Sequence, residues 1–381
     1  MLMHRLLIVA GLAFSSIKAS GQWEIQDSHT TADLRGIHSI SGGVAWASGT
    51  NGTILRTDDG GSVWHRCAIP PGAERLDFRG VQGIDSNTAV ALSSGKGELS
   101  RLYRTTDGCQ TWKLVLTNPD KEGFFDAVRF DLVTVVYPQN DPKLIRGTIV
   151  GDPVGGSFVI YQSLDAGETW KRWANDKYEH PAVAKTNEAI FAASNSAVTV
   201  PGVNGPLAFV TGGAGGSRLF LAQPHSPFDA SYWLAFTVID LSINATPTSG
   251  AFSVASRFPP NSPFADLMIV GGDYSKPEAS DRTAIFAPAP RFLFATRTIS
   301  PRVSPHGYRS AVAYDATHKA WIAVGPNGTD ISTDDGRNWR SLKPASTDEP
   351  DADQYWNALS LPLVVGPHGR IGKLDQNALT R

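Results

Sequence analysis

The sequence predicts an all-β chain that folds as a seven-bladed β-propeller. Three observations lead to this prediction: a repeated octapeptide with a turn-forming pattern, the spacing between its copies, and 37 Gly and 25 Pro among 381 residues. A composition this rich in turn-forming residues argues against a helical protein. A mean period of about 51 residues suits a four-stranded propeller blade.

Residues 1–21 predict a signal peptide. Arg5 supplies a positive charge, residues 6–14 form an apolar run, and Ala19 and Gly21 are small residues placed for cleavage before Gln22. The alternative, a membrane anchor, is disfavoured because the apolar run is too short for a bilayer of about 30 Å. We therefore expect an exported protein, periplasmic or extracellular. Residues 22–381 then form one domain with no transmembrane segment.

The octapeptide Ser/Thr-x-Asp-x-Gly-x-x-Trp occurs four times, starting at Thr57, Thr105, Ser163 and Ser332. Its Asp can accept backbone N–H bonds across a turn, its Gly tolerates positive φ, and its Trp can pack between sheets. A strand-like run precedes each copy, so the pattern indicates a structural hairpin turn. The Asp and Trp residues concerned are Asp59 and Trp64, Asp107 and Trp112, Asp165 and Trp170, and Asp334 and Trp339.

The spacing of the copies predicts the number of blades. The long interval between the third and fourth copies leaves room for two blades that lack a recognisable octapeptide. A three-strand group near the C-terminus lacks a fourth strand, and residues 22–26 can supply it, which closes the ring and removes an exposed edge. Six or eight blades are the alternatives. The expected strands are 189–194, 207–211 and 218–222; 251–255, 267–271 and 284–287; and 356–361, 363–366 and 370–374.

Several classes of function are disfavoured. The formal net charge of −2 does not provide the basic field that nucleic-acid binding needs. The nine histidines are scattered without a Cys/His cluster, so no metal site is predicted. The glycine-rich stretch 212–217 lacks the ending of a phosphate loop, and no cofactor is predicted. Cys67 and Cys109 are either one disulfide or two separate thiols, because the sequence does not supply their geometry.

The octapeptide resembles the Asp box of sialidases and of related propellers with bacterial neuraminidase repeats. This resemblance implies that the boxes are structural turns on the face opposite the active site. Sialidases also carry Phe/Tyr-Arg-Ile/Leu-Pro before the first box, whereas residues 33–37 read Asp-Leu-Arg-Gly-Ile, without proline. The chain therefore departs from the sialidase pattern at Arg35.

Residues 36–372 look like the secreted relatives of photosystem II assembly and stability factors, which are seven-bladed propellers described as YCF48-related. The resemblance rests on residues 44–53, 76–79, 307–314 and 324–328. It implies the fold and a protein-binding or assembly role. The basic patch of the photosynthetic members has no counterpart that can be mapped onto this sequence.

The first residues of the innermost strands form a candidate site. In a propeller they ring the mouth of the central channel, on the face away from the Asp boxes. The alternative is that their charges pair with one another in a polar channel. Alignment of the blades by their boxes places Arg35, Arg79, Asp126, Glu188, Ser249, Tyr308, Arg309, Trp356 and Asn357 there, and nearby loops add Asp152, Asp273 and Tyr274.

Two functional hypotheses follow from this ring. In the favoured one, a monomeric propeller recruits a protein or envelope ligand without chemistry, and the ligand-binding residues are Arg35, Arg79, Arg309, Asp152, Asp273, Trp356 and Asn357. In the other, the chain is a glycoside hydrolase or polysaccharide lyase for acidic sugars. The arginines would then hold the anion. Asp126 and Glu188 would share acid–base work, assisted by Tyr308 or Tyr274.

Overall fold

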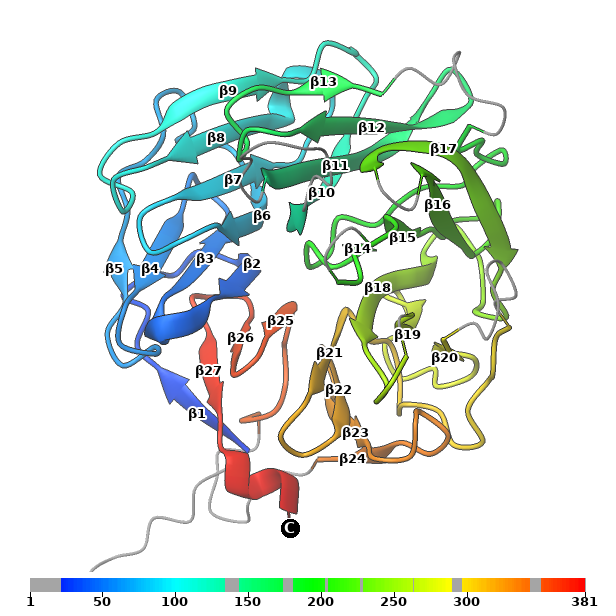
Figure 1. The fold of residues 1–381 in the computed structure, drawn as a ribbon. Coiled ribbons are helices and arrows are strands. Elements are labelled where there is room, and N and C mark those ends of the chain that lie inside the picture. Colours follow the sequence, from blue (N-terminus) through cyan, green and yellow to red (C-terminus); the bar gives the residue numbers. More distant parts are fainter. Residues whose placement is uncertain are drawn as a thin grey trace, which may run out of the picture.

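The computed structural model describes residues 22–133, 144–173, 181–202, 205–226, 229–262, 264–289, 297–342 and 351–380. The predicted signal peptide at 1–21 lies outside these residues. The described chain forms seven antiparallel sheets arranged as blades around a central axis (Figure 1). The prediction of an all-β, seven-bladed propeller is therefore confirmed. None of the helices in this part of the chain is long and apolar enough to cross a membrane.

Blades one to three are four-stranded, and in each the octapeptide lies between the third and fourth strands. Every residue of β7, AVALS, is buried, as expected for a strand covered on both faces. The strands are β2 (Leu34–Ser39), β3 (Ala45–Gly49), β4 (Ile54–Thr57) and β5 (His65–Arg66); β6 (Phe78–Gly83), β7 (Ala89–Ser93), β8 (Arg101–Thr105) and β9 (Lys113–Thr117); and β10 (Phe125–Val133), β11 (Leu144–Val154), β12 (Ser157–Ser163) and β13 (Lys171–Arg172).

Blades four and five are the two that lack the octapeptide. The innermost strand of blade four was expected at 189–194, but it is the short β14, and residues 189–196 follow another path, described below. The strands are β14 (Val198–Thr199), β15 (Ala208–Val210), β16 (Arg218–Ser226) and β17 (Asp229–Asp240), then β18 (Ser249–Arg257), β19 (Asp266–Asp273) and β20 (Ala284–Ala287).

Blade seven combines both ends of the described chain. Its outermost strand, β1, pairs antiparallel with β27, with Trp23 opposite Leu374 and Gln26 opposite Ile371 (Figure 1). Blades six and seven comprise β21 (Ala311–Asp315), β22 (Ala320–Gly325), β23 (Gly328–Ser332) and β24 (Arg340–Ser341), then β25 (Ala358–Ser360), β26 (Leu363–Val365), β27 (Ile371–Leu374) and β1 (Trp23–Gln26). Short 3-10 helices are η1 (Ser41–Gly43), η2 (Gly97–Leu99) and η4 (Gln376–Thr380).

The hydrophobic core lies between adjacent blades. Phe158 of blade three, for example, packs edge-on against Phe209 and Phe220 of blade four, with ring centroids 5.5 and 5.2 Å apart. Trp46 and Trp321 are fully buried in other interfaces between blades. This arrangement leaves the central axis to the residues of the innermost strands.

The four octapeptide turns share one hydrogen-bonding pattern. In the first, Thr57 Oγ1 donates to Asp59 Oδ1 at 2.8 Å, and the same oxygen accepts the Val63 N–H at 3.0 Å. Asp107, Asp165 and Asp334 accept equivalent bonds in the other copies. Trp64, Trp112 and Trp339 are buried and Trp170 is partly buried. We refer to these segments as the repeat turns.

The repeat turns lie at the end of the propeller where the innermost strands finish. In blade one, β4 runs in the same direction as β2, because both are antiparallel to β3. The turn that follows β4 is therefore on the face where β2 ends. The starts of the innermost strands, where the candidate site was expected, lie on the opposite face.

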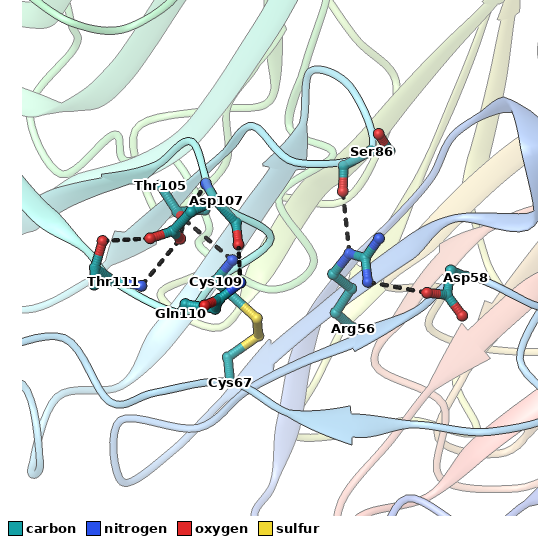
Figure 2. The surroundings of a disulfide bond; sticks show 9 residues. All are labelled: Arg56, Asp58, Cys67, Ser86, Thr105, Asp107, Cys109, Gln110 and Thr111. Carbon is teal, nitrogen blue, oxygen red and sulfur yellow. Dashed lines mark hydrogen bonds and ion pairs between the residues drawn. A yellow bond between two sulfur atoms is a disulfide. The ribbon is translucent and has the colours of Figure 1, made fainter.

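Cys67 and Cys109 form a disulfide, which decides between the two alternatives left by the sequence. Cys67 follows β5 of blade one, and Cys109 lies in the repeat turn of blade two, next to Asp107 and its hydrogen bonds to Thr105 and Thr111 (Figure 2). The bond therefore links two neighbouring blades. A backbone hydrogen bond from Ala68 N to Cys109 O, 3.2 Å long, supports the same contact.

Candidate functional site

Two arginines from neighbouring blades share one carboxylate at the start of the innermost strands. Arg35 Nε lies 3.3 Å from Asp77 Oδ1, and Arg79 Nε donates to Asp77 Oδ2 at 2.8 Å. The three side chains are 30%, 31% and 25% exposed for Arg35, Arg79 and Asp77. Two guanidinium groups on one carboxylate leave a positive charge that an anionic ligand group can pair with.

Asp126 and Asp152 form a carboxyl pair beside Arg79. Asp126 is 1% exposed, and its Oδ2 has no hydrogen-bond partner. Asp152 accepts a hydrogen bond from Ile190 N at 3.0 Å. Burial, with a smaller contribution from the Asp152 charge, raises the pKa of Asp126 well above its usual value. Burial raises the pKa of Asp152 to about 6. The fold therefore favours the protonated form of Asp126, and Asp152 changes its charge near pH 6.

Residues 192–196, which we call the channel plug, cross the channel between its mouth and its interior. Their Ser and Asn side chains bond to backbone and hydroxyl groups of other blades, which competes with strand formation. The contacts are Arg79 Nη1 to Ala192 O at 3.3 Å, Ser194 Oγ to Ser310 O at 2.7 Å, Asn195 to Val128 N and O at 2.8 and 3.1 Å, and Ser196 Oγ to Ser253 Oγ at 2.7 Å.

An aromatic cluster lies at the mouth, directly before the channel plug. Phe191 stacks on Phe252 with ring centroids 4.1 Å apart, and Tyr274 packs edge-on to both rings at 6.2 Å. Tyr274 is 50% exposed. Tyr308 packs edge-on against Phe252 at 4.7 Å and is buried, and burial raises its pKa above the usual value. Of the two candidate tyrosines, only Tyr274 is therefore open to a ligand.

The structure does not bring Glu188 or Arg309 to the surface of the mouth. Glu188 is buried, where Arg218 Nε donates to its Oε1 at 2.8 Å and Thr211 Oγ1 donates to the same oxygen at 2.5 Å. Arg309 is fully buried and donates from Nε to Asp330 Oδ2 at 2.8 Å. Buried charges need partners, and these two residues find theirs inside the fold. Their expected roles in acid–base work and anion binding do not fit these positions.

Four further residues of the expected site also serve the fold. Trp356 is 1% exposed and packs against Trp23 with ring centroids 5.8 Å apart. Asn357 Nδ2 donates to Leu34 O at 2.8 Å and so joins blade seven to blade one. Asp273 is partly exposed and accepts the Ser275 N–H at 2.9 Å in a local turn. Ser249 is buried and donates to Thr246 Oγ1 at 2.9 Å.

The mouth also contains residues that the sequence did not single out. Asp77 lies two positions before Arg79, so a count of charges at the strand start would have included it. Phe191 belongs to the segment 189–194, whose sequence suggested an ordinary innermost strand, and Asn195 directly follows it. Only the polar Ser194-Asn195-Ser196 at its end departs from a strand pattern. Over the described ranges, no three His, Cys, Asp or Glu side chains lie together in a way that could hold a metal ion.

Fold and site together define a seven-bladed β-propeller with a plugged channel and a polar and aromatic mouth. No protein-family model matches the chain, and no curated protein matches it. A solved structure titled "YCF48 bound to D1 peptide" is similar with a TM-score of 0.56 and 17% identity, and the match covers 93% of this chain and 96% of that chain. YCF48 from Cyanidioschyzon merolae has a TM-score of 0.56 and 19% identity, with 93% and 99% covered.

At these identities the similarity concerns the fold. YCF48 is thus a structural neighbour of the chain over nearly its whole length. This finding agrees with the resemblance stated from the sequence as far as the architecture is concerned. The likeness of the repeat turns to the Asp boxes of sialidases is still a resemblance of sequence alone.

Proposed function

We propose that this chain is an exported propeller that binds a segment of another protein at its channel mouth. One observation carries the proposal: the arginine pair on Asp77 lies beside an aromatic cluster that includes the half-exposed Tyr274. The channel plug joins the arginine pair to the aromatic cluster. Arg79 donates a hydrogen bond to Ala192 O, and Phe191 of the cluster directly precedes Ala192. Arginine and aromatic side chains carry much of the binding energy of protein interfaces.

The composition of the mouth defines the kind of segment that fits. Its unmatched guanidinium charge favours an Asp or Glu side chain or a C-terminal carboxylate. The partly exposed rings of Phe191 and Tyr274 favour an apolar or aromatic residue nearby. The neighbouring structure titled as YCF48 bound to a D1 peptide supports the proposal, since it shows a propeller of this kind with a peptide ligand.

Export is part of the same proposal. Its supports are the signal-like layout of residues 1–21 and the disulfide between Cys67 and Cys109, because disulfides persist in oxidising compartments. Mass spectrometry of the protein recovered from fractionated cells tests it. An N-terminus at Gln22 in the periplasm or medium is expected, and an uncleaved chain in the cytoplasm would contradict it.

Photo-crosslinking in the native host tests the binding face. A photoreactive phenylalanine analogue replaces Tyr274 at the mouth or, as a control, Val63 in the first repeat turn, because these side chains are similarly exposed at 50% and 45%. We expect a defined crosslinked protein from position 274 only, and its loss when Arg79→Ala is added. Equal crosslinking from position 63, or no effect of Arg79→Ala, would argue against the mouth as the binding surface.

The carboxyl pair supports a second candidate function, hydrolysis or elimination on an acidic sugar. Asp126 and Asp152 have raised pKa values at the mouth, which is typical of acid–base catalysis but also of structural burial. The enzyme hypothesis therefore shifts from Asp126 with Glu188 to Asp126 with Asp152.

A turnover screen against acidic and neutral oligosaccharides tests this second function. Under the enzyme hypothesis, wild type and Glu188→Gln both form product, provided that the variant folds, and Asp152→Asn does not. Absence of product across the panel favours the binding function.

A further inference from the structure

A cavity lies in the channel behind the plug. It has a volume of about 260 Å³ and is lined by residues from the innermost strands of all seven blades. Its lining includes His38 and Gln82, which follow Arg35 and Arg79 by three residues on the same strands. Three strand residues span about 10 Å, so this axial pocket is separate from the mouth. Ser194, Asn195 and Ser196 of the channel plug are also part of its lining.

Among the described residues that line the axial pocket, Arg129 supplies the one permanent charge. No Asp or Glu side chain belongs to the described lining. Arg129 Nε is buried without a hydrogen-bond partner, and among the described contacts the guanidinium has no ion pair. The carboxylate that influences it, Asp131, is already bound by Arg146 through hydrogen bonds of 3.1 and 2.7 Å. Arg129 is thus a largely desolvated cation that faces a cavity to which no described Asp or Glu side chain contributes.

Neutral polar groups surround this cation. His38 Nδ1 accepts the Gly83 N–H at 3.1 Å, so the ring proton is on Nε2, which is free to donate. Burial, together with Arg129, lowers the pKa of His38 to about 3, so the ring is neutral. Gln82 Oε1 is buried without a partner. The hydroxyl groups of Thr199, Ser256 and Ser360 complete the polar part of the lining.

We propose that the axial pocket binds a small oxyanion, a carboxylate or a phosphate, with Arg129 as its counterion. A carboxylate or phosphate matches the two-pronged geometry of a guanidinium group and supplies the acceptors that Arg129 lacks. Because no carboxylate belongs to the described lining, the anion can enter without displacing an internal partner among these residues. This site is distinct from the protein-binding mouth, and neither proposal depends on the other.

Isothermal titration with inorganic phosphate and, separately, with glutarate tests the site. The two probes distinguish a phosphate from a dicarboxylate as the better ligand. Wild type is compared with Arg129→Met, which removes the charge at similar length, and with Arg79→Met, a matched substitution at the mouth. We expect saturable binding of one anion in wild type and in Arg79→Met. Arg129→Met should weaken binding by at least about tenfold.

A second variant makes the test independent of how Arg129→Met folds. Gln82→Glu places a carboxylate in the pocket as an internal partner for Arg129. It should weaken binding of either probe at least about tenfold and raise the melting temperature in anion-free buffer. The proposal is overturned if wild type binds neither probe in the millimolar range. It is equally overturned if Gln82→Glu, or a folded Arg129→Met, binds as wild type does.

Discussion

The surroundings of each charged side chain determine its role in this propeller. Glu188 and Arg309 are held in buried ion pairs with Arg218 and Asp330. Arg35 and Arg79 share Asp77 and keep about a third of their side-chain surface exposed. Charged residues that were expected at one site therefore stabilise the fold in some blades and offer a binding group in others.

Asp152 should make stability depend on pH. Its pKa in the folded chain, about 6, is above the usual 3.8, so ionisation is disfavoured in the fold and stability is lost as pH rises between these values. Asp152→Asn removes this penalty and can keep the bond from Ile190. Between pH 4 and pH 7, the free energy of unfolding of the variant should rise relative to that of wild type by on the order of 2–3 kcal/mol. Urea unfolding of both proteins at pH 4 and pH 7 measures this difference. If the free energy of unfolding changes equally with pH in both proteins, the prediction is refuted.

Arg309→Met should destabilise the chain strongly. The substitution removes the arginine from a buried ion pair and leaves the Asp330 carboxylate with His306, and breaking such a pair typically costs about 3–5 kcal/mol. Arg35→Met, at the exposed mouth, should cost less than about 1 kcal/mol. Denaturant unfolding of the two variants provides the comparison. Similar losses of unfolding free energy in both variants would show that Arg309 does not have the structural role that its burial indicates.

At the scale of elements, the disulfide and the channel plug are two of the connections between blades that lie outside the ladders of strand hydrogen bonds. The disulfide joins the end of blade one to the repeat turn of blade two (Figure 2). The channel plug joins blade four to other blades through Asn195 and the two flanking serines. Both restrain blades relative to one another, which the internal hairpins cannot do.

Removal of the disulfide should lower stability without changing the fold. Cys67 and Cys109 are 42 residues apart, and a loop of this length predicts a loss of about 2–4 kcal/mol when the cross-link is absent. The double substitution Cys67→Ala/Cys109→Ala avoids free thiols. Thermal unfolding with and without reductant measures the effect. Reductant should lower the melting temperature of wild type only, and an effect on the variant would point to another cause.

Asn195→Ala should weaken the channel plug. It removes the partners of both the N–H and the C=O of Val128, and buried backbone groups without partners cost about 1–3 kcal/mol. Hydrogen exchange should show faster exchange of the Val128 amide, with the outer strands of blade three unchanged. Unchanged protection of Val128 would mean that Asn195 does not hold the plug in place.

At the scale of the whole molecule, the ring depends on one strand from the start of the described chain. Besides pairing with β27, the β1 segment contacts blade six, since Trp23 Nε1 donates to Thr329 Oγ1 at 2.9 Å. Without this strand, the edge of β27 would be open to pairing with other chains. The integrity of the propeller therefore rests on a contact between residues more than three hundred positions apart.

Deletion of residues 22–26 from the chain that begins at Gln22 should cause aggregation. The deletion exposes the β27 edge and removes the buried Trp23 ring from the interface with Trp356. Size-exclusion chromatography should show a shift from monomer to large species. Glu24→Ala, an exposed position of the same strand, is the control and should remain monomeric. A monomeric deletion product would show that closure is not needed.

The sequence by itself determined the class of fold and the number of blades. Each repeat turn depends on residues within eight positions of one another, and strands adjacent in sequence pair in the same blade. These are local interactions that a short pattern specifies. The same locality explains why the repeat turns were interpreted as structural, in agreement with the bonds of Asp59 and Asp107.

Only the tertiary structure decided which residues meet across blades. It joined Cys67 to Cys109 and buried Arg309 on Asp330. In place of the expected strand at 189–194 it has a segment that leads into the channel plug. It also placed Arg129 in a cavity whose described lining includes no carboxylate. These contacts depend on how the blades twist and pack around a common axis. No sequence pattern within one blade contains that information, because the partner belongs to another blade.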